Sequence, residues 1–265
     1  MPTPDIGPRH PWFAGADTPR VLAHRGLVTA EAAAHGIAEN SFAAVAAAHA
    51  AGALFVESDC HLTSDGTVVL FHDDDLSRVT GDPRPITEVT VTELSDLMAE
   101  RGGLITLEQA LESFPLTRFN LDVKAAGAAE SIGRIVAPHA DRVLLASFSD
   151  ARRRAALDAA EREGDGIRPA TSAGKATLAR VLRAVVLRSR RLAARALADV
   201  DALQIPERQS GIRVLSPRLV DYAHASGVEV HVWTVNAPDD MRRLVALGVD
   251  GIVTDHADVA LAALA

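Results

Sequence analysis

Cysteine, aromatic residues and lysine are scarce in this chain of 265 residues. The single cysteine, Cys60, excludes an internal disulfide, so cysteine usage gives no sign of secretion and we expect a cytoplasmic protein. Aromatic residues make up only 4% of the chain, which means that alanine, valine and leucine must fill most of any core. Lysine occurs only twice, as Lys124 and Lys175, whereas arginine occurs 25 times. Each lysine is therefore a candidate for a role that arginine cannot fill.

Long apolar runs are also missing. No stretch approaches the roughly 18 apolar residues of a membrane span, and the proline-rich N-terminus has no apolar run of the signal-peptide type. We therefore expect no stable membrane insertion, and a short unstructured arm over about residues 1–18. A net charge of −8 argues against nucleic-acid binding. The hydrophobic share of 48% is typical of a soluble globular protein with a sizeable core.

Eight short apolar or β-branched runs recur along the chain, and helical patterns follow them. This alternation indicates parallel strands joined by crossover helices, and eight such units fit an α/β fold of the (β/α)8 TIM barrel type. An open doubly wound sheet is the alternative, but no G-x-G-x-x-G motif follows the first run. The expected strands are Arg20–His24, Leu54–Asp59, Arg118–Lys124, Arg142–Phe148, Arg168–Thr171, Ala202–Pro206, Glu229–Val235 and Gly251–Thr254.

One interval between expected strands is about twice as long as the others. The extra piece covers about residues 60–103, and Asp65-Gly66 lies between two alternating runs, which is a strong hairpin signal. We therefore expect a β-hairpin and one short helix inserted after the second strand. This position is at the C-terminal face of the barrel, where active sites of this fold lie. The whole chain, residues 1–265, is expected to form a single barrel domain.

Acidic side chains at the ends of two expected strands suggest a metal site. Glu57 and Asp59 are two residues apart on one strand, so both face the same side, and Asp122 ends the next strand. Carboxylates this close stay ionised cheaply only when a cation lies between them. Ligation by oxygen alone favours a hard divalent cation, Mg²⁺ or Ca²⁺, with Mn²⁺ as a further option.

Two histidines point to proton transfer at the same face. His24 follows the first strand and His72 follows the hairpin, so their side chains can converge. Two imidazoles on opposite sides of a phosphorus atom would act as general base and general acid, and the sequence does not say which is which. Arg25 offers a bidentate fork for phosphate oxygens, and Lys124 shares a strand face with Asp122 and offers a compact positive charge.

Several motifs together carry a family resemblance, from about residue 21 to residue 256: VLAHRG, AENSF, FVESDCHL, VVLFHDD, FNLDVK, VWTVN and GVDGIVTD. In this order and spacing the sequence resembles the glycerophosphodiester phosphodiesterase family. The resemblance implies a (β/α)8 barrel that hydrolyses a small-molecule glycerophosphodiester to sn-glycerol 3-phosphate and an alcohol, using a divalent metal. The roles that it implies are an acid–base pair (His24, His72), phosphate or substrate binding (Arg25, Glu39, Lys124, Trp233) and metal binding (Glu57, Asp59, Asp122).

The sequence departs from the family pattern at two places. Ala38-Glu39-Asn40-Ser41 stands where the family usually has Pro-Glu-Asn-Thr, and serine caps a helix as well as threonine does. Asp122 stands where the family usually has glutamate, and its side chain is one methylene shorter. We expect either a water-bridged metal contact or a metal drawn toward this strand, and the alternative is a simple ion pair between Asp122 and Lys124.

Two further functions remain open from the sequence. A lysophospholipase D that acts on lipids with one acyl chain would need an apolar groove, and no clear acyl-binding stretch is present. A catalytically silent barrel that only binds a phosphorylated ligand would not need both His24 and His72. The nucleophile, either water or the neighbouring glycerol 2-hydroxyl, the preferred alcohol and the oligomeric state are not predicted.

A basic stretch covers residues 174–198, with seven lysine or arginine residues and no acidic residue. Such a stretch can touch an anionic membrane surface. The simpler expectation is one ordinary barrel helix with a solvated arginine face. The sequence favours the simpler expectation, because Leu178, Val181 and Val185 supply the apolar stripe that a barrel helix needs.

Overall fold

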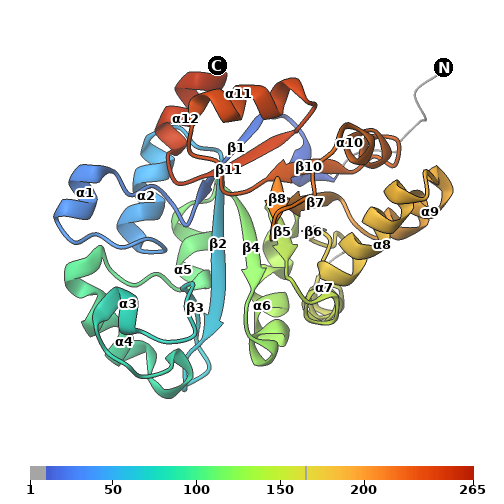
Figure 1. Cartoon of the computed structure of the whole chain (residues 1–265). Coiled ribbons are helices and arrows are strands. Elements are labelled where there is room, and N and C mark those ends of the chain that lie inside the picture. The colour runs from blue at the N-terminus through green and yellow to red at the C-terminus, as the bar shows by residue number, and fades with distance from the viewer. Residues whose placement is uncertain (1–9, 165) are drawn as a thin grey trace.

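The computed structural model describes residues 10–164 and 166–265. It contains the eight parallel strands of the predicted barrel (Figure 1). Each predicted strand is found, usually one to three residues shorter at an end than its apolar run. The strands are β1 (Arg20–His24), β2 (Phe55–Leu62), β4 (Arg118–Val123), β5 (Val143–Ala146), β6 (Ala170–Thr171), β7 (Ala202–Ile205), β10 (Glu229–Val232) and β11 (Gly251–Thr254).

The strands pair in the order β6-β5-β4-β2-β1-β11-β10-β7, and every neighbouring pair is parallel. The two ends of this order are successive strands. An isolated parallel bridge joins Ser172 to Ala202, and the amide of Ala173 donates to the carbonyl of Ala202 at 3.0 Å. The sheet therefore closes on itself, and the TIM-barrel prediction is confirmed.

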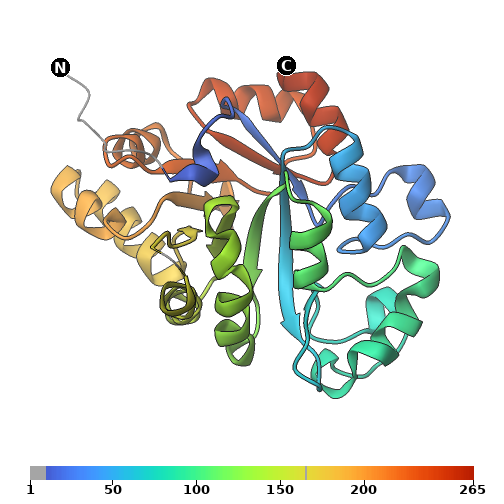
Figure 2. The same cartoon turned by 180° about the vertical axis from the view of Figure 1, so that it is seen from behind.

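Helices surround the strands on the outside (Figures 1 and 2). Capping boxes are present at Thr90 and Thr106, and Ser216 caps a helix that begins at Pro217. The helices of the barrel layer and its loops are α1 (Ala30–Ala34), α2 (Phe42–Ala50), α5 (Leu107–Ser113), α6 (Ala129–Val136), α7 (Asp150–Glu163), α8 (Lys175–Val186), α9 (Arg190–Leu197), α10 (Pro217–His224), α11 (Pro238–Ala246) and α12 (Ala257–Leu264), with 3₁₀ turns η1 (Pro11–Phe13), η4 (Ala126–Ala128) and η5 (Ala137–Arg142).

The segment after β2 has more helix than the one short helix predicted. Strand β3 (Val68–Leu70) pairs antiparallel with the end of β2, and Gly66 takes a φ of 83° in the turn between them. Two helices, α3 (Ser77–Thr80) and α4 (Val91–Met98), and two 3₁₀ turns, η2 (Ile86–Glu88) and η3 (Ala99–Arg101), follow. Their apolar side chains form a cluster of their own around Phe71, Leu76, Ile86, Leu94 and Met98.

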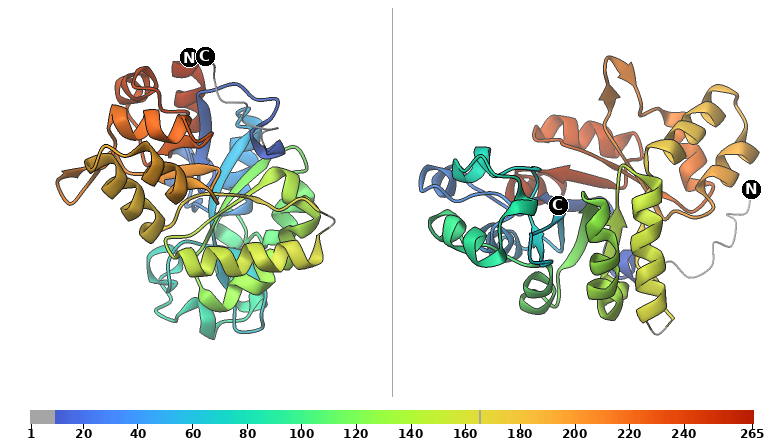
Figure 3. Two further views of the ribbon diagram at one scale, coloured as in Figure 1. Left: turned by 90° about the vertical axis from the view of Figure 1, so that its right-hand side faces the viewer. Right: turned by 90° about the horizontal axis from the view of Figure 1, so that it is seen from below.

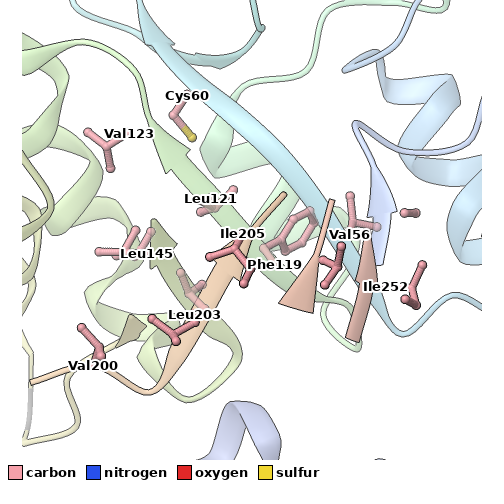
Figure 4. Close-up of a cluster of buried hydrophobic side chains, with 14 of the residues drawn as sticks. Val56, Cys60, Phe119, Leu121, Val123, Leu145, Val200, Leu203, Ile205 and Ile252 are labelled. Atoms are coloured by element: carbon pink, nitrogen blue, oxygen red, sulfur yellow. The ribbon is translucent and has the colours of Figure 1, made fainter. Parts of the chain in front are cut away.

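Most of the hydrophobic core lies between the strands and the helices. Every second side chain of a strand points to the same face. Val56, Leu121, Leu145 and Leu203 are among the side chains of this core that Figure 4 shows. Cys60 is fully buried in the same cluster, and burial strongly raises the pKa of its thiol. The single cysteine is thus a small packing residue, as its strand position predicts.

The N-terminal arm is more ordered than expected in its described part, residues 10–18. The side chain of Trp12 is fully buried at the amino ends of the strands, where its ring packs on Phe55 and its Nε1–H donates to the carbonyl of Phe119 at 3.1 Å. An arm anchored by a buried tryptophan thus covers the amino ends of the strands. The expectation for residues 1–9 lies outside the described residues.

A buried charge network lies beside Trp12 at this end of the barrel. Arg20 of β1 forms two hydrogen bonds, of 2.8 and 2.9 Å, with the carboxylate of Glu229 of β10. His231 Nε2 lies 3.1 Å from the same carboxylate, and all three residues are at most 2% exposed. The network ties β1 to β10. It also reaches toward the pocket that contains the predicted site residues, because His231 Nδ1 lies 3.4 Å from the side-chain nitrogen of Gln204.

The expectation of one helix over residues 174–198 is wrong. The segment forms two helices, α8 and α9, because Arg188 adopts a left-handed φ of 52° and a new helix begins at Arg190, where the side chain of Ser189 accepts a hydrogen bond from the amide of Leu192. Across residues 10–164 and 166–265, no helix has the length and apolarity needed to cross a membrane.

Candidate active site

The carboxyl ends of the strands surround a pocket of about 310 Å³. This is the end of a TIM barrel at which its loops build active sites. Glu39 does not line the pocket, but its Oε1 accepts a hydrogen bond of 2.6 Å from Arg25, which does. The other predicted site residues all line it: His24, Arg25, Glu57, Asp59, His72, Asp122, Lys124 and Trp233.

The turn after β1 brings Arg25 into the pocket through unusual backbone angles. Arg25 and Asn40 have φ values of 59° and 55°, which are uncommon for residues with a side chain. Gly26 has a φ of 87°, and a Cβ on it would lie 2.6 Å from the backbone of Ala44. Only glycine therefore fits this close approach of the turn to helix α2, which explains the glycine of the His-Arg-Gly motif.

His24 is oriented by Asp255, a carboxylate for which the sequence predicted no role. Its Nδ1–H donates to Asp255 at 2.6 Å, and Asp255 in turn accepts a 2.7 Å hydrogen bond from the side chain of Asn236. Nε2 faces the pocket and lies 3.8 Å from Glu57. Burial lowers the pKa of His24, but the hydrogen bond to Asp255 and the charge of Glu57 outweigh burial and raise it.

His72 has the same kind of support from its neighbour in the sequence. Its Nδ1–H donates to Asp73 at 2.6 Å, and Arg78 donates to the other oxygen of Asp73 at 2.6 Å. Burial raises the pKa of Asp73, but the hydrogen bonds from Arg78 and His72 outweigh it and lower the pKa. Asp73 therefore stays ionised and orients His72.

Lys124 lies between two of the predicted metal ligands. Its Nζ is 2.8 Å from Asp59 and 2.7 Å from Asp122 Oδ2, and Arg25 Nε is 3.2 Å from the other oxygen of Asp59. Burial lowers the pKa of Lys124, but the charges of the two carboxylates outweigh it and raise the pKa. In this arrangement protein cations neutralise Asp59.

Two buried carboxylate oxygens in the pocket accept no hydrogen bond from the described residues. They are Glu57 Oε2 and Asp122 Oδ1. The side-chain oxygen of Asn120, which also lines the pocket, is likewise buried and accepts no hydrogen bond from the described residues. Burial and then the charge of Asp59 raise the pKa of Glu57 to about 8. Buried oxygens without donors are the pattern expected where a cation is bound. Even so, no three His, Cys, Asp or Glu side chains of the described residues are gathered as a metal site.

The opposite wall of the pocket is aromatic. Phe148 follows β5 and packs edge-on against Trp233, with ring centroids 6.1 Å apart, and the ammonium group of Lys124 lies 5.7 Å from the Phe148 ring. The sequence predicts Trp233 at this pocket but gives no sign of Phe148, because a lone phenylalanine after a strand carries no chemical signal. The pocket is thus charged on one side and apolar on the other.

Comparison with known proteins agrees with this geometry. Residues 24–259 match the Glycerophosphoryl diester phosphodiesterase family. A protein of Mycobacterium tuberculosis named "Probable glycerophosphodiester phosphodiesterase 2" is 36% identical over 242 residues, which cover 90% of this chain and 88% of that protein. Human "Lysophospholipase D GDPD1" is 24% identical over 250 residues, covering 82% of this chain and 79% of its own length.

Solved structures share the fold. A glycerophosphodiester phosphodiesterase from Parabacteroides distasonis superposes with a TM-score of 0.68 at 25% identity, covering 94% of this chain and 98% of that one. A phosphodiesterase from Oleispira antarctica, solved in complex with the product sn-glycerol-3-phosphate, gives a TM-score of 0.69 at 24% identity, covering 93% and 97%. Since the match to the family extends over nearly the whole barrel and starts at the histidine that ends β1, the chain belongs to the glycerophosphoryl diester phosphodiesterase family, a family of phosphodiester-hydrolysing enzymes.

Proposed function

We propose that this enzyme hydrolyses glycerophosphodiesters to sn-glycerol 3-phosphate and an alcohol. The observation that carries the proposal is the pair of histidines at one pocket, each with Nδ1 held by a carboxylate and Nε2 left for other partners. An alcohol is a poor leaving group, so one imidazole must protonate it while the other removes a proton from the nucleophile. The relative from Oleispira antarctica, solved with sn-glycerol-3-phosphate, supports this choice of product.

The cations of the pocket supply the electrostatic part of the reaction. Negative charge on the phosphoryl oxygens grows toward the transition state, and Arg25 and Lys124 stabilise that charge from fixed positions. Glu39 bridges Arg25 and Arg78, at 2.6 and 2.7 Å, and so fixes the guanidinium of Arg25. Trp233 and Phe148 form the apolar wall, which suits the carbon skeleton of the glycerol or of the alcohol.

A divalent cation, Mg²⁺, Ca²⁺ or Mn²⁺, belongs to the proposal. The two carboxylate oxygens without donors, on Glu57 and Asp122, would hold it, and Asp59 would join them once Lys124 turns toward substrate. When bound, it would act as a Lewis acid on the phosphoryl oxygens. The side chain of Asp122 already pairs with Lys124 through one oxygen, so its other oxygen alone is left for the metal.

A panel of substrates tests the proposal. Purified protein is incubated with glycerophosphocholine, glycerophosphoethanolamine, glycerophosphoinositol and a lysophospholipid, each with Mg²⁺, Ca²⁺, Mn²⁺ or EDTA. We expect release of sn-glycerol 3-phosphate from at least one glycerophosphodiester and loss of turnover with EDTA. Release of lysophosphatidate instead would favour the lysophospholipase D activity named for the human relative, and no release from any substrate would refute the proposal.

The cellular location is a separate part of the proposal. We propose a cytoplasmic enzyme, on the strength of its single buried cysteine and the lack of a membrane-spanning helix in residues 10–164 and 166–265. Fractionation of the producing cells with an antibody against the protein tests this, and recovery outside the cytoplasmic fraction would contradict it.

A further inference from the structure

We propose that helices α8 and α9 form a docking surface for an anionic phospholipid membrane. Figures 1 and 3 show the two helices as a pair at the periphery of the molecule, next to α10. Their segment carries seven basic residues and no acidic residue, although the whole chain has a net charge of −8. A positively charged surface on a negatively charged protein is not required for solubility and indicates an anionic partner.

The charges are mostly free of partners. Arg190 pairs with Asp221 at 2.6 Å and lies over the ring of Tyr222, so it attaches α9 to α10. Arg183, Arg191 and Arg195 are exposed and form no ion pair with any residue that the structure describes. Neighbouring arginines that lack acids repel one another, and a bound anion would relieve that repulsion.

A groove between the two helices brings several of these charges together. It has a volume of about 350 Å³, and Arg180, Arg183 and Arg195 stand around it. Its remaining lining is apolar and comes from Ala184, Leu192 and Ala196. Guanidinium groups beside a small apolar floor match a phosphodiester head group that continues into hydrocarbon, because the fork binds phosphate oxygens and the floor accepts methylene groups.

Large apolar side chains extend from the same surface. Val186 and Leu187, at the connection between α8 and α9, are 78% and 55% exposed, and Leu192 is 41% exposed. Exposed aliphatic residues flanked by arginines are the pattern of segments that lie in a membrane interface, with aliphatic groups inserted and charges at the phosphates. An acidic protein or a nucleic acid would bind the arginines but would leave Val186 and Leu187 exposed to water. A membrane is the partner that accounts for both the charges and the aliphatic side chains.

Co-sedimentation with vesicles tests the proposal, which does not depend on the proposed hydrolytic function. We compare vesicles of phosphatidylcholine alone with vesicles that also contain phosphatidylglycerol, at low and at high salt. The protein is expected to sediment with the anionic vesicles at low salt, to remain in solution with neutral vesicles, and to be released partly by salt. A protein that stays in solution with both kinds of vesicle, or sediments equally with both, overturns the proposal.

Matched variants localise the binding. The triple variant R183Q/R191Q/R195Q is expected to bind anionic vesicles on the order of 100-fold more weakly, since each basic residue near the membrane contributes about fivefold. The control R134Q/R154Q/R242Q removes three exposed arginines of α6, α7 and α11 and is expected to bind like the parent protein. Equal binding of the two triple variants would place the binding elsewhere and overturn the assignment to α8 and α9.

A second variant separates a membrane from an acidic macromolecule. V186S/L187S keeps every charge, and we expect it to lose several-fold in affinity and all binding that resists high salt. If it binds vesicles like the parent protein, or if the parent binds DNA or polyglutamate as tightly as vesicles, the partner is not a membrane. Both exposed positions tolerate serine, and equal thermal unfolding of all variants checks that the fold is intact.

Discussion

At the scale of single residues, the two oxygens of Asp122 have different surroundings. Oδ2 lies 2.7 Å from the ammonium group of Lys124, and Oδ1 is buried without a hydrogen-bond donor in the described part of the chain. One oxygen can therefore form the ion pair with Lys124 while the other binds a metal. Substitutions that remove the charge of Asp122 or lengthen its side chain distinguish the two roles.

Substitution of Asp122 tests the metal role. We expect Asp122→Asn to raise the metal concentration for half-maximal activity several-fold, because one of the oxygens that would hold the cation is replaced. Asp122→Glu should preserve or tighten metal binding, because glutamate reaches one methylene further. Calorimetric titration of Ca²⁺ or Mn²⁺ provides a readout independent of turnover. Titration curves of both variants that overlay the parent curve would remove Asp122 from the metal site.

Asp255 provides a second test at this scale. It accepts the Nδ1 proton of His24 at 2.6 Å and so keeps Nε2 directed to the pocket. We expect Asp255→Asn to lower kcat roughly 100-fold while KM changes little, because orientation and tautomer of the imidazole are lost. Asp258→Asn, an exposed position three residues later on α12, is the control and should leave kcat unchanged. If the two variants have the same kcat, Asp255 does not position His24.

At the scale of elements, the buried network of Arg20, Glu229 and His231 connects β1 to β10 at the amino ends of the strands. Burial raises the pKa of Glu229, but the hydrogen bonds from His231 and Arg20 outweigh it and lower the pKa to about 2 from an ordinary 4.5. A carboxyl with a lowered folded-state pKa stabilises the fold above its unfolded pKa. That stability is lost as the pH falls from about 4.5 toward 2.

Glu229→Gln tests this contribution. We expect the free energy of unfolding at pH 7 to fall by about 3 kcal/mol, because the substitution removes an ionised partner of buried Arg20. The difference from the parent protein should shrink as the pH is lowered below about 4.5. Urea unfolding at several pH values measures it, with Glu112→Gln on the exposed face of α5 as control. A difference that stays constant with pH would contradict the assigned pKa.

Elements with capping signals were predictable, and the connection inside the basic stretch was not. Thr90 with Glu93 and Thr106 with Gln109 predict helix starts, because the two side chains of each pair accept hydrogen bonds from backbone N–H groups of the first helical turn. The interruption between α8 and α9 depends on one left-handed residue, Arg188, which the sequence does not distinguish from its arginine neighbours. The turn is closed by backbone hydrogen bonds from Arg188 to Val185 and from Ser189 to Ala184. Glycine usually marks such a left-handed helix end, and arginine gives no such sign.

At the scale of the whole molecule, the barrel topology was predictable from the sequence, and so was the gathering of most predicted site residues at one pocket, but their hydrogen-bond partners were not. Barrel topology places the ends of successive strands around one mouth, so residues such as His24 and Asp122 could be assigned from strand position. The partner of His24 is Asp255, 231 residues away, and only closure between β1 and β11 brings them together. Likewise, the sequence gives no sign that Trp12 covers the opposite end.

Under the proposed function, His24 and His72 perform the proton transfers of phosphodiester hydrolysis, so replacing each of them by alanine is the decisive experiment. Values of kcat/KM are measured for a glycerophosphodiester and for a nitrophenyl phosphodiester, whose leaving group needs no proton. We predict losses of about 10²–10⁴-fold for both variants on the first substrate, and recovery on the second for the variant that lacks the general acid. If neither variant loses more than about tenfold on the glycerophosphodiester, the proposal is contradicted.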